Sequence, residues 1–476
     1  MTDPTLPTDS LDMDSALVGD LMRPSTLDSS LAQRISTDIR EPVVFSQSFC
    51  RFSLDRKGFL SHQSKIAFSV IPAVANSFAY FPVSVGVNSL ISRCVLKVGN
   101  RTIAETQEFG ALQGYRSLFE TGEENVEREQ FLTQRMINHI PNYDVTAGGG
   151  EFLHSQTNSA SYGLYSGIDE RAATSIPADW EAPKYLRLDG NYPAESPVYS
   201  IFLGDLFDIF ANQDLPLFML DDEVHIELHF TPPKQKRCCL AVTAPAQTAD
   251  QDYLIDQSET RMIYDTIYYS GDAMEAFRAK ADRDGGLTFN YLDYRLTRRT
   301  ASTAGAFDNL TQAIGGAGRF VDKIIVRIAN DDKDAERSLL NSYECQAPKA
   351  GEERAINLRY NDRFEFPIDR SNSSLLFSTM REAEGDVPFI TRAEYGTEMT
   401  GAITENTYHG HVQKANLASK FNYLCLRPSR EERVNNQGMD LIYKCPMATE
   451  SLTLLVWIGL RKVATLKDGH FDCYFA

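Results

Sequence analysis

The chain has 476 residues and carries 47 Lys and Arg against 65 Asp and Glu, for a formal net charge of −18. This length allows about two to four domains, and the apolar fraction of 42% excludes a chain that is disordered throughout. The acidity argues against a nucleic-acid-binding surface spread over the molecule, because such surfaces depend on many Lys and Arg contacts to phosphate. No apolar run approaches the ~18 residues of a membrane span, and we expect no secretory signal at the N-terminus.

Residues 1–40 differ in composition from the rest of the chain. They contain seven Asp, no Glu and three Arg, with many Ser, Thr and Pro, and they show no strand pattern. This composition predicts a flexible N-terminal arm. The alternative is an arm that becomes ordered on a neighbouring subunit.

A first β-rich unit is expected over residues 41–232. Half-buried strands are indicated by alternating apolar and polar side chains at 49–54, 66–70, 93–98, 198–203 and 224–230. Pro232-Pro233 ends the last of them, and short helices are predicted at 111–120 and 204–210. A long loop insertion at 105–195 is rich in Ser, Asn and Gly, and loops of this length are commonly functional or placed at an interface.

A linker is predicted at 233–260, and a second β-rich unit is expected at 261–476. Strands are predicted at 319–328, on either side of the Asn361-Asp362 turn, and at 452–460, where apolar residues on both faces indicate a central strand. The two units resemble each other in order. Each has a basic, alternating strand (93–98 and 323–328) and ends in a strongly apolar strand (224–230 and 452–460). The pattern therefore predicts an all-β chain of two similar β-sandwiches with short helices.

Signatures of catalysis and of structural metal binding are missing from the sequence. It contains no G-x-x-x-x-G-K-[ST], G-x-S-x-G or H-E-x-x-H motif. Its eight cysteines form no C-x-x-C pair, so we expect no structural zinc. Cys50, Cys94 and Cys473 lie in apolar runs and are predicted to be reduced core residues of a protein made in the cytosol. We therefore expect no catalytic residue, no metal ligand and no cofactor.

Two groups that contain histidine are candidate metal ligands. His225, Glu227 and His229 alternate along one predicted strand, so their side chains share a face, and imidazole and carboxylate can ligate zinc or iron. Residues on the same face lie about 6.6–7 Å apart along a strand, which makes it awkward for the outer two to reach one ion. We expect this face, like the pair His409 and His411, to be solvated or part of an interface instead.

Two parts of the chain carry a recognisable pattern. The stretch 199–230 contains Leu206-Phe207-Asp208-Ile209-Phe210 and Leu215-Pro216-Leu217 before its last strand. The second part comprises 318–328, Asn341-Ser342-Tyr343 and 357–362. These parts resemble the end of the first jelly roll and the second jelly roll of double jelly-roll major capsid proteins of icosahedral double-stranded DNA viruses, a group that includes nucleocytoplasmic large DNA viruses, virophages and polinton-like viruses.

The resemblance implies a fold of two consecutive antiparallel jelly rolls and a structural function without an active site. It implies a homotrimer that forms a nearly hexagonal capsomer, tiles an icosahedral shell and is located in the virion after assembly inside the host cell. The implied partners are neighbouring capsomers and minor capsid and penton proteins, with a possible internal membrane beneath the shell. Direct sequence-specific binding of nucleic acid is not implied.

Two other functions are compatible with a β-rich chain. One is a cell-surface or carbohydrate-binding β-sandwich protein, suggested by the Tyr-, Asn- and Ser-rich loops. The other is a cupin-like metal-binding jelly-roll enzyme, for which the strand with His225 is the only supporting feature of the sequence. We rank both below the capsid protein.

Overall fold

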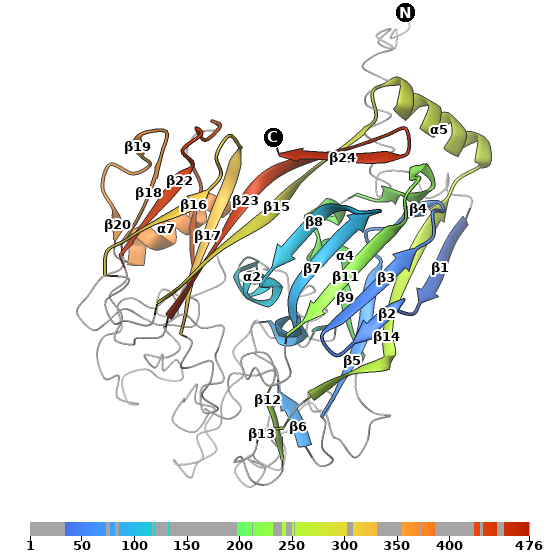
Figure 1. Cartoon of the computed structure of the whole chain (residues 1–476), viewed down its shortest axis with the longest axis horizontal. Helices are drawn as coiled ribbons and strands as arrows, with labels where there is room; N and C mark the ends of the chain where they lie inside the picture. The colour runs from blue at the N-terminus through green and yellow to red at the C-terminus, as the bar shows by residue number, and fades with distance from the viewer. Residues whose placement is uncertain are drawn as a thin grey trace, which may run out of the picture.

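The computed structural model describes residues 34–72, 77–80, 85–116, 119, 132–133, 198–211, 213–231, 240–243, 250–251, 253–301, 308–330, 355–371, 373–385, 423–428, 432–444 and 452–475. Among these residues, no helix is both long and apolar enough to cross a membrane. The described strands pair antiparallel and form two sandwiches, which Figure 1 shows side by side. The all-β fold expected from the sequence is confirmed.

One sheet of the first sandwich has five strands. In spatial order they are β2 (Val44–Ser46), β3 (Phe49–Leu54), β11 (Val224–Phe230), β7 (Ile91–Val98) and β8 (Arg101–Gln107). Ile226 on β11 lies opposite Phe52 on β3 and Leu96 on β7, and all three side chains are fully buried. The alternation seen in the sequence therefore places one face of each strand in the core.

The facing sheet is assembled from segments far apart in the sequence. Its strands are β10 (Leu215–Pro216), β4 (Phe59–Leu60), β14 (Tyr253–Tyr268), β5 (Lys65–Pro72) and β9 (Val198–Phe202), with β1 (Arg34–Arg40) paired to β14. A small third sheet contains β13 (Asp250–Gln251), β12 (Leu240–Thr243) and β6 (Ser77–Tyr80). Apolar side chains from the two large sheets form one continuous core.

Two boundaries differ from those predicted. The arm was expected to reach residue 40, but its last seven residues form β1, which pairs with β14 from Arg34↔Tyr268 to Arg40↔Met262. β14 begins in the expected linker 233–260 and continues into the expected second unit, yet it pairs with β1, β4 and β5 of the first sandwich. Most side chains of β1 are exposed on both faces, so no periodic pattern of burial marked this strand in the sequence.

The second sandwich is built from the C-terminal part of the chain. Its first sheet contains β15 (Leu287–Ala301), β23 (Leu452–Lys467), β17 (Val321–Asn330) and β21 (Leu424–Leu426), with β24 (His470–Phe475) paired to β23. Its second sheet contains β16 (Leu310–Gly315), β22 (Met439–Lys444), β18 (Ala355–Tyr360) and β19 (Arg363–Phe364), with β20 (Arg370–Ser371) on β18. The predicted turn Asn361-Asp362 joins β18 to β19, and both residues have positive φ.

The order of strands confirms that the two sandwiches resemble each other. In the first, the last apolar strand β11 lies between β3 and β7. In the second, the last apolar strand β23 lies between β15 and β17. The pairs of strands that were similar in the sequence, β7 with β17 and β11 with β23, thus occupy equivalent places.

Helices are short and lie at the ends or edges of the sheets. Those of the first sandwich are η2 (Gly86–Leu90), α2 (Phe109–Arg116), α4 (Leu203–Leu206), η7 (Asp208–Phe210) and η8 (Leu217–Met219). The longer helices are α5 (Gly271–Arg283), between β14 and β15, and α7 (Ser373–Glu384), in the second sandwich. β8 and α2 occupy the start of the predicted insertion 105–195, most of which lies outside the described residues.

Candidate functional site: the seam between the two sandwiches

The face with the candidate metal ligands is occupied by ion pairs. Glu227, whose side chain is only 4% exposed, lies between Arg51 on β3 and Lys97 on β7. One carboxylate oxygen is 2.8 Å from a guanidinium nitrogen of Arg51, and the other is 2.9 Å from the Lys97 amine. Burial raises the pKa of Glu227, but Lys97 and Arg51 outweigh burial and lower it overall. This carboxylate therefore serves to hold three neighbouring strands together.

The two histidines of this face are separate from each other and have different neighbours. The ring of His229 packs against Phe49, with 4.9 Å between ring centroids, and its pKa is lowered by burial and by Arg93. His225 lies 3.8 Å from a carboxylate oxygen of Glu223. Within the described ranges, no group of three or more His, Cys, Asp or Glu is placed to hold a metal ion. His409 and His411 lie outside those ranges.

Two long strands run through both sandwiches. β15 and β23 pair without interruption from Leu287↔Leu466 to Ala301↔Leu452. At one end, Leu287 and Leu466 belong to the core of the first sandwich; nearer the other end, Leu454 belongs to the core of the second. Figure 1 shows this pair of strands extending from one sandwich to the other. Because strands in a hydrogen-bonded sheet cannot hinge freely, the pair fixes the orientation of the sandwiches.

Main-chain carbonyls of β8 accept hydrogen bonds from side chains of these long strands. The indole N–H of Trp457 donates to the carbonyl of Gln107 at 3.0 Å. The hydroxyl of Tyr291 donates to the carbonyl of Ile103 at 2.7 Å, and the amine of Lys462 reaches the same oxygen at 2.5 Å. An edge of the first sandwich is thus closed by the second, which removes an exposed strand edge from solvent.

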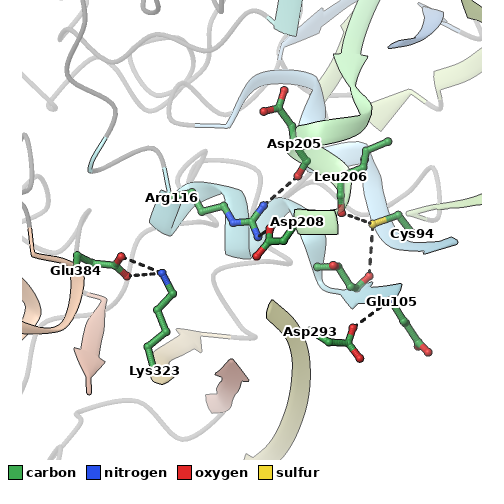
Figure 2. Close-up of polar contacts among 10 residues, drawn as sticks. Cys94, Glu105, Arg116, Asp205, Leu206, Asp208, Asp293, Lys323 and Glu384 are labelled. Carbon is green, nitrogen blue, oxygen red and sulfur yellow. Dashed lines mark hydrogen bonds and ion pairs between the residues drawn. The ribbon is translucent and has the colours of Figure 1, made fainter. Parts of the chain in front are cut away.

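A buried carboxylate reinforces this edge. Asp293 on β15 accepts the backbone N–H of Glu105 on β8 at 3.2 Å and lies 3.2 Å from the amine of Lys462 (Figure 2 shows Asp293 with Glu105). Both side chains of the pair Asp293 and Lys462 are at most 5% exposed. Burial raises the pKa of Asp293, and the nearby Lys462 and Arg295 only partly offset this effect. Removing either partner would leave a buried group without its counterion.

We call the contacts between the two sandwiches the seam. The C-terminal end of α2 places Arg116 in this seam. Arg116 donates to Asp208 at 2.7 Å and to the main-chain carbonyl of Asp205 at 3.0 Å (Figure 2). Its guanidinium lies over the ring of Tyr294 on β15, 5.2 Å from the ring centroid. Burial lowers the pKa of Arg116, but Asp208 and other neighbours raise it overall, so this side chain stays charged.

Tyr115, the residue before Arg116, links α2 to the second sandwich. The hydroxyl of Tyr115 donates to Glu384 on α7 at 2.6 Å. The two oxygens of Glu384 also accept from the amine of Lys323 on β17, at 3.0 and 2.9 Å (Figure 2). Nearby, the hydroxyl of Tyr423 donates to the carbonyl of Ala111 at 2.8 Å. Helix α2 is therefore held by two side chains of the second sandwich, Glu384 of α7 and Tyr423, which precedes β21.

The polar side chains of the seam attach the two sandwiches rigidly to each other, and the buried cysteines are not activated as nucleophiles. The thiols of Cys94 and Cys425 are buried, and burial raises the pKa of Cys94 to about 12 and also raises the pKa of Cys425. A thiol with a raised pKa is a poor nucleophile at neutral pH. Cys50 is likewise buried, as predicted, whereas Cys473 is only partly buried.

The residues of the seam could not be identified from the sequence. Tyr115, Arg116 and Glu384 belong to short helices without a recognisable motif. One signal was present: Lys462 interrupts a strongly apolar strand, and a lysine in such a position must find a counterion. Its counterion Asp293 is 169 residues away, so the pair could not be assigned from the sequence.

No protein-family model matches this sequence, and no curated protein matches it. Similarity is found among solved structures. A chain of the cryo-EM structure of the Sputnik virophage matches with a TM-score of 0.52 at 9% identity, covering 93% of this chain and 89% of that chain. The mavirus major capsid protein matches with a TM-score of 0.51 at 10% identity, covering 100% of this chain and 96% of that one. The fold of this chain is therefore the double jelly roll found in viral major capsid proteins.

Proposed function

We propose that this protein is the major capsid protein of an icosahedral double-stranded DNA virus and that it acts as a structural protein, without catalysis. The observation that supports this most is the similarity in fold to the mavirus major capsid protein over 100% of this chain and 96% of that one. The seam adds a physical reason, because a shell subunit must keep its shape under load. Its place of action is then the capsid of the virion.

We infer that three copies form the capsomer. Each copy contributes two similar sandwiches, so three copies around a threefold axis bring six similar blocks into a ring. Such a ring is nearly hexagonal and can tile a flat facet. The contacts between copies are heterologous, with the first sandwich of one subunit beside the second sandwich of the next, and they close because the rotation is threefold.

The seam would set the shape of this block. If the two sandwiches could hinge, the six blocks would not hold a hexagonal outline. The paired strands β15 and β23, together with the contacts of Trp457 and Glu384, oppose such a motion. We propose that this rigidity is the contribution of each chain to the mechanism of assembly.

The net negative charge of the chain would hold capsomers apart until the solution conditions favour assembly. A net charge of −18 keeps separate capsomers apart by repulsion and therefore soluble. Salt screens this repulsion between exposed charges, so contacts between capsomers should depend on ionic strength. Minor capsid and penton proteins, and a membrane beneath the shell, are proposed further partners, and we propose no sequence-specific contact with nucleic acid.

Expression of the chain alone, followed by negative-stain electron microscopy, tests the proposed function. We expect hexagonal particles that associate into sheets or shells as the salt concentration is varied. A uniform preparation of single, non-associating chains over the whole range of salt and pH would contradict the proposal. Neither the carbohydrate-binding alternative nor the cupin-like alternative gains support from an observation among the described residues.

A further inference from the structure

Lys462 and Asp293 are the most deeply buried pair of oppositely charged side chains in the described part of the chain, with 5% and 1% of their side chains exposed. In the ladder of β15 and β23, Lys462 lies opposite Tyr291 and Asp293 lies opposite Leu460, so the two are diagonal neighbours on one face of the sheet. The amine lies 3.2 Å from Oδ2 of Asp293. An amine and a carboxyl group are thus held in contact where little water can reach them.

The edge of the first sandwich fixes the position of both groups. The carbonyl of Ile103 accepts a hydrogen bond from the Lys462 amine at 2.5 Å, and the backbone N–H of Glu105 donates to Oδ1 of Asp293 at 3.2 Å (Figure 2 shows the contact of Glu105 with Asp293). Both donor and acceptor belong to β8. The amine also lies 5.2 Å from the ring centroid of Phe475. The two reactive groups therefore have one arrangement, set by main-chain atoms and shielded by an aromatic ring.

This environment favours a neutral product over a pair of ions. Two buried charges lose the hydration that they would have in water, and their mutual attraction offsets that loss only in part. Burial raises the pKa of Asp293, and Lys462 and Arg295 counter this effect incompletely, so the carboxyl group is shifted towards the acid form that an amine can attack. Holding two reactants in contact corresponds to an effective molarity of roughly 10⁵–10⁸ M. Condensation would remove both charges from the interior.

We propose that the amine of Lys462 condenses with the carboxyl group of Asp293 to form an isopeptide bond between β23 and β15. A proton first passes from the ammonium to Oδ2, which gives a neutral amine and a carboxylic acid. Nζ then attacks Cγ, and the N–H of Glu105 stabilises the negative charge that develops on Oδ1. The Cγ–Oδ2 bond breaks, and Oδ2 leaves as water with a second proton from the amine.

The atoms and charges of this step balance within the pair. One ammonium and one carboxylate become one amide and one water molecule, so the step needs no oxidant, cofactor or second protein. The bond forms within one chain and therefore does not depend on the proposed capsomer. It joins positions 169 residues apart and fixes the two strands that run through both sandwiches. Cross-links that close long loops restrict the unfolded chain most, so this bond would also resist unfolding of the seam.

The pair Lys323 and Glu384 provides an internal comparison. Its side chains are 16% and 15% exposed, so water reaches both charges. Both oxygens of Glu384 accept from the amine, at 3.0 and 2.9 Å, and one of them also accepts from the hydroxyl of Tyr115 at 2.6 Å. These three hydrogen bonds stabilise the charged carboxylate. We therefore expect this pair to stay ionic and the chain to lose one water molecule, not two.

Peptide mapping of the full-length chain tests the proposal. The folded protein is stored for several days, denatured, digested with trypsin and analysed by mass spectrometry. We expect a branched peptide in which 284–295 is joined to 462–467, with a mass lower than the sum of the two by one water molecule and with no cleavage after Lys462. Recovery of 284–295 and 463–467 as linear peptides at their full sequence masses would overturn the proposal.

Loss of water at another place is distinguished in the same map. Asp284-Gly285 lies within 284–295, and attack of a main-chain nitrogen on its carboxyl group would also release one water molecule. That reaction gives a linear peptide 284–295 of reduced mass and leaves cleavage after Lys462 intact. This outcome would overturn the cross-link.

Three variants assign the reacting groups. Lys462→Arg should give no branched peptide, because a guanidinium is a poor nucleophile, whereas the matched control Lys323→Arg should retain it. Asp293→Asn should form the same bond with loss of ammonia in place of water. A branched peptide in Lys462→Arg would assign the bond to another amine and overturn the proposal. If Lys462→Arg does not fold, Asp293→Asn decides, because a branched peptide that still lacks water would mean that Cγ of residue 293 does not react.

Discussion

Trp457 and Gln107 lie 350 positions apart in the sequence and are joined by a hydrogen bond of 3.0 Å from the indole N–H to a main-chain carbonyl. Trp457 is fully buried in the core of the second sandwich, and Gln107 ends β8 of the first. The side chain of Trp457 therefore fills the core of one sandwich and at the same time donates a hydrogen bond to a main-chain carbonyl at the edge of the other.

Replacing Trp457 with Phe should loosen the edge of the first sandwich. The carbonyl of Gln107 loses its donor, and a smaller ring leaves a void in the core, so we expect a loss of about 2–4 kcal/mol of stability. Hydrogen exchange should become faster at the amides of β8, while the amides of β18 and β22 serve as an internal control. Equal acceleration in both regions would mean that Trp457 only fills the core and does not attach β8.

Replacing Glu384 with Ala should destabilise the seam more than any exposed substitution on the same helix. The change leaves the largely buried amine of Lys323 without its counterion and Tyr115 without its acceptor, which we expect to cost about 3 kcal/mol. Urea unfolding measures the effect. Glu382→Ala is the matched control, because Glu382 lies on the same helix but is exposed and accepts from Ser378. Similar losses in the two variants would contradict the role given to the seam.

The pair His62 and Asp214 should make stability depend on pH near neutrality. The ring of His62 is 2.7 Å from the buried carboxylate, and this hydrogen bond raises the pKa of His62 despite its partial burial. A raised pKa means that the folded state holds the proton more tightly, so the contribution is complete below about pH 6.5 and is lost as the pH rises through the folded pKa.

The measurement is the difference in unfolding free energy between the unaltered chain and His62→Gln from pH 5.5 to 8.5. We expect the difference to shrink as the pH rises. His225→Gln is the control, since the carboxylate nearest to His225 belongs to the exposed Glu223 and lies 3.8 Å away. A difference that grows with pH would show that Asp214 does not favour the charged ring.

Metal analysis of the purified protein should give far less than one equivalent of zinc or iron per chain. The reason is that Glu227 is already held by Arg51 and Lys97, so a cation would have to displace two positive charges. Treatment with a chelator should leave the melting temperature unchanged. About one bound equivalent, together with a lower melting temperature after chelation, would overturn this interpretation of the His225 strand.

The sequence predicted those elements whose two faces have different surroundings. β3 and β11 were placed at their observed bounds because apolar and polar residues alternate strictly. β1 was missed because most of its side chains are exposed on both faces, and β14 was assigned to the wrong unit because its pairing is with strands almost 200 residues earlier. Local patterns carry no information on such pairing.

The contacts of the seam could not be predicted from the sequence for a different reason. Its acceptors include the main-chain carbonyls of Ile103, Gln107 and Ala111, and any residue type can supply a carbonyl. Its donors, such as Tyr291 and Trp457, look like ordinary core residues in the sequence. The extended strands β15 and β23 were also predicted too short or not at all, because their polar residues, such as Lys462 and Asp293, are buried as a pair.

The central claim is that three rigid chains form one capsomer, and the mass in solution tests it most directly. Size-exclusion chromatography with light scattering should give 160.2 kDa, three times the 53.4 kDa of one chain, as a single sharp peak. Glu384→Ala should broaden or dissociate this peak, while Glu382→Ala should not. A stable monomer or dimer of the unaltered chain at all protein concentrations would contradict the account.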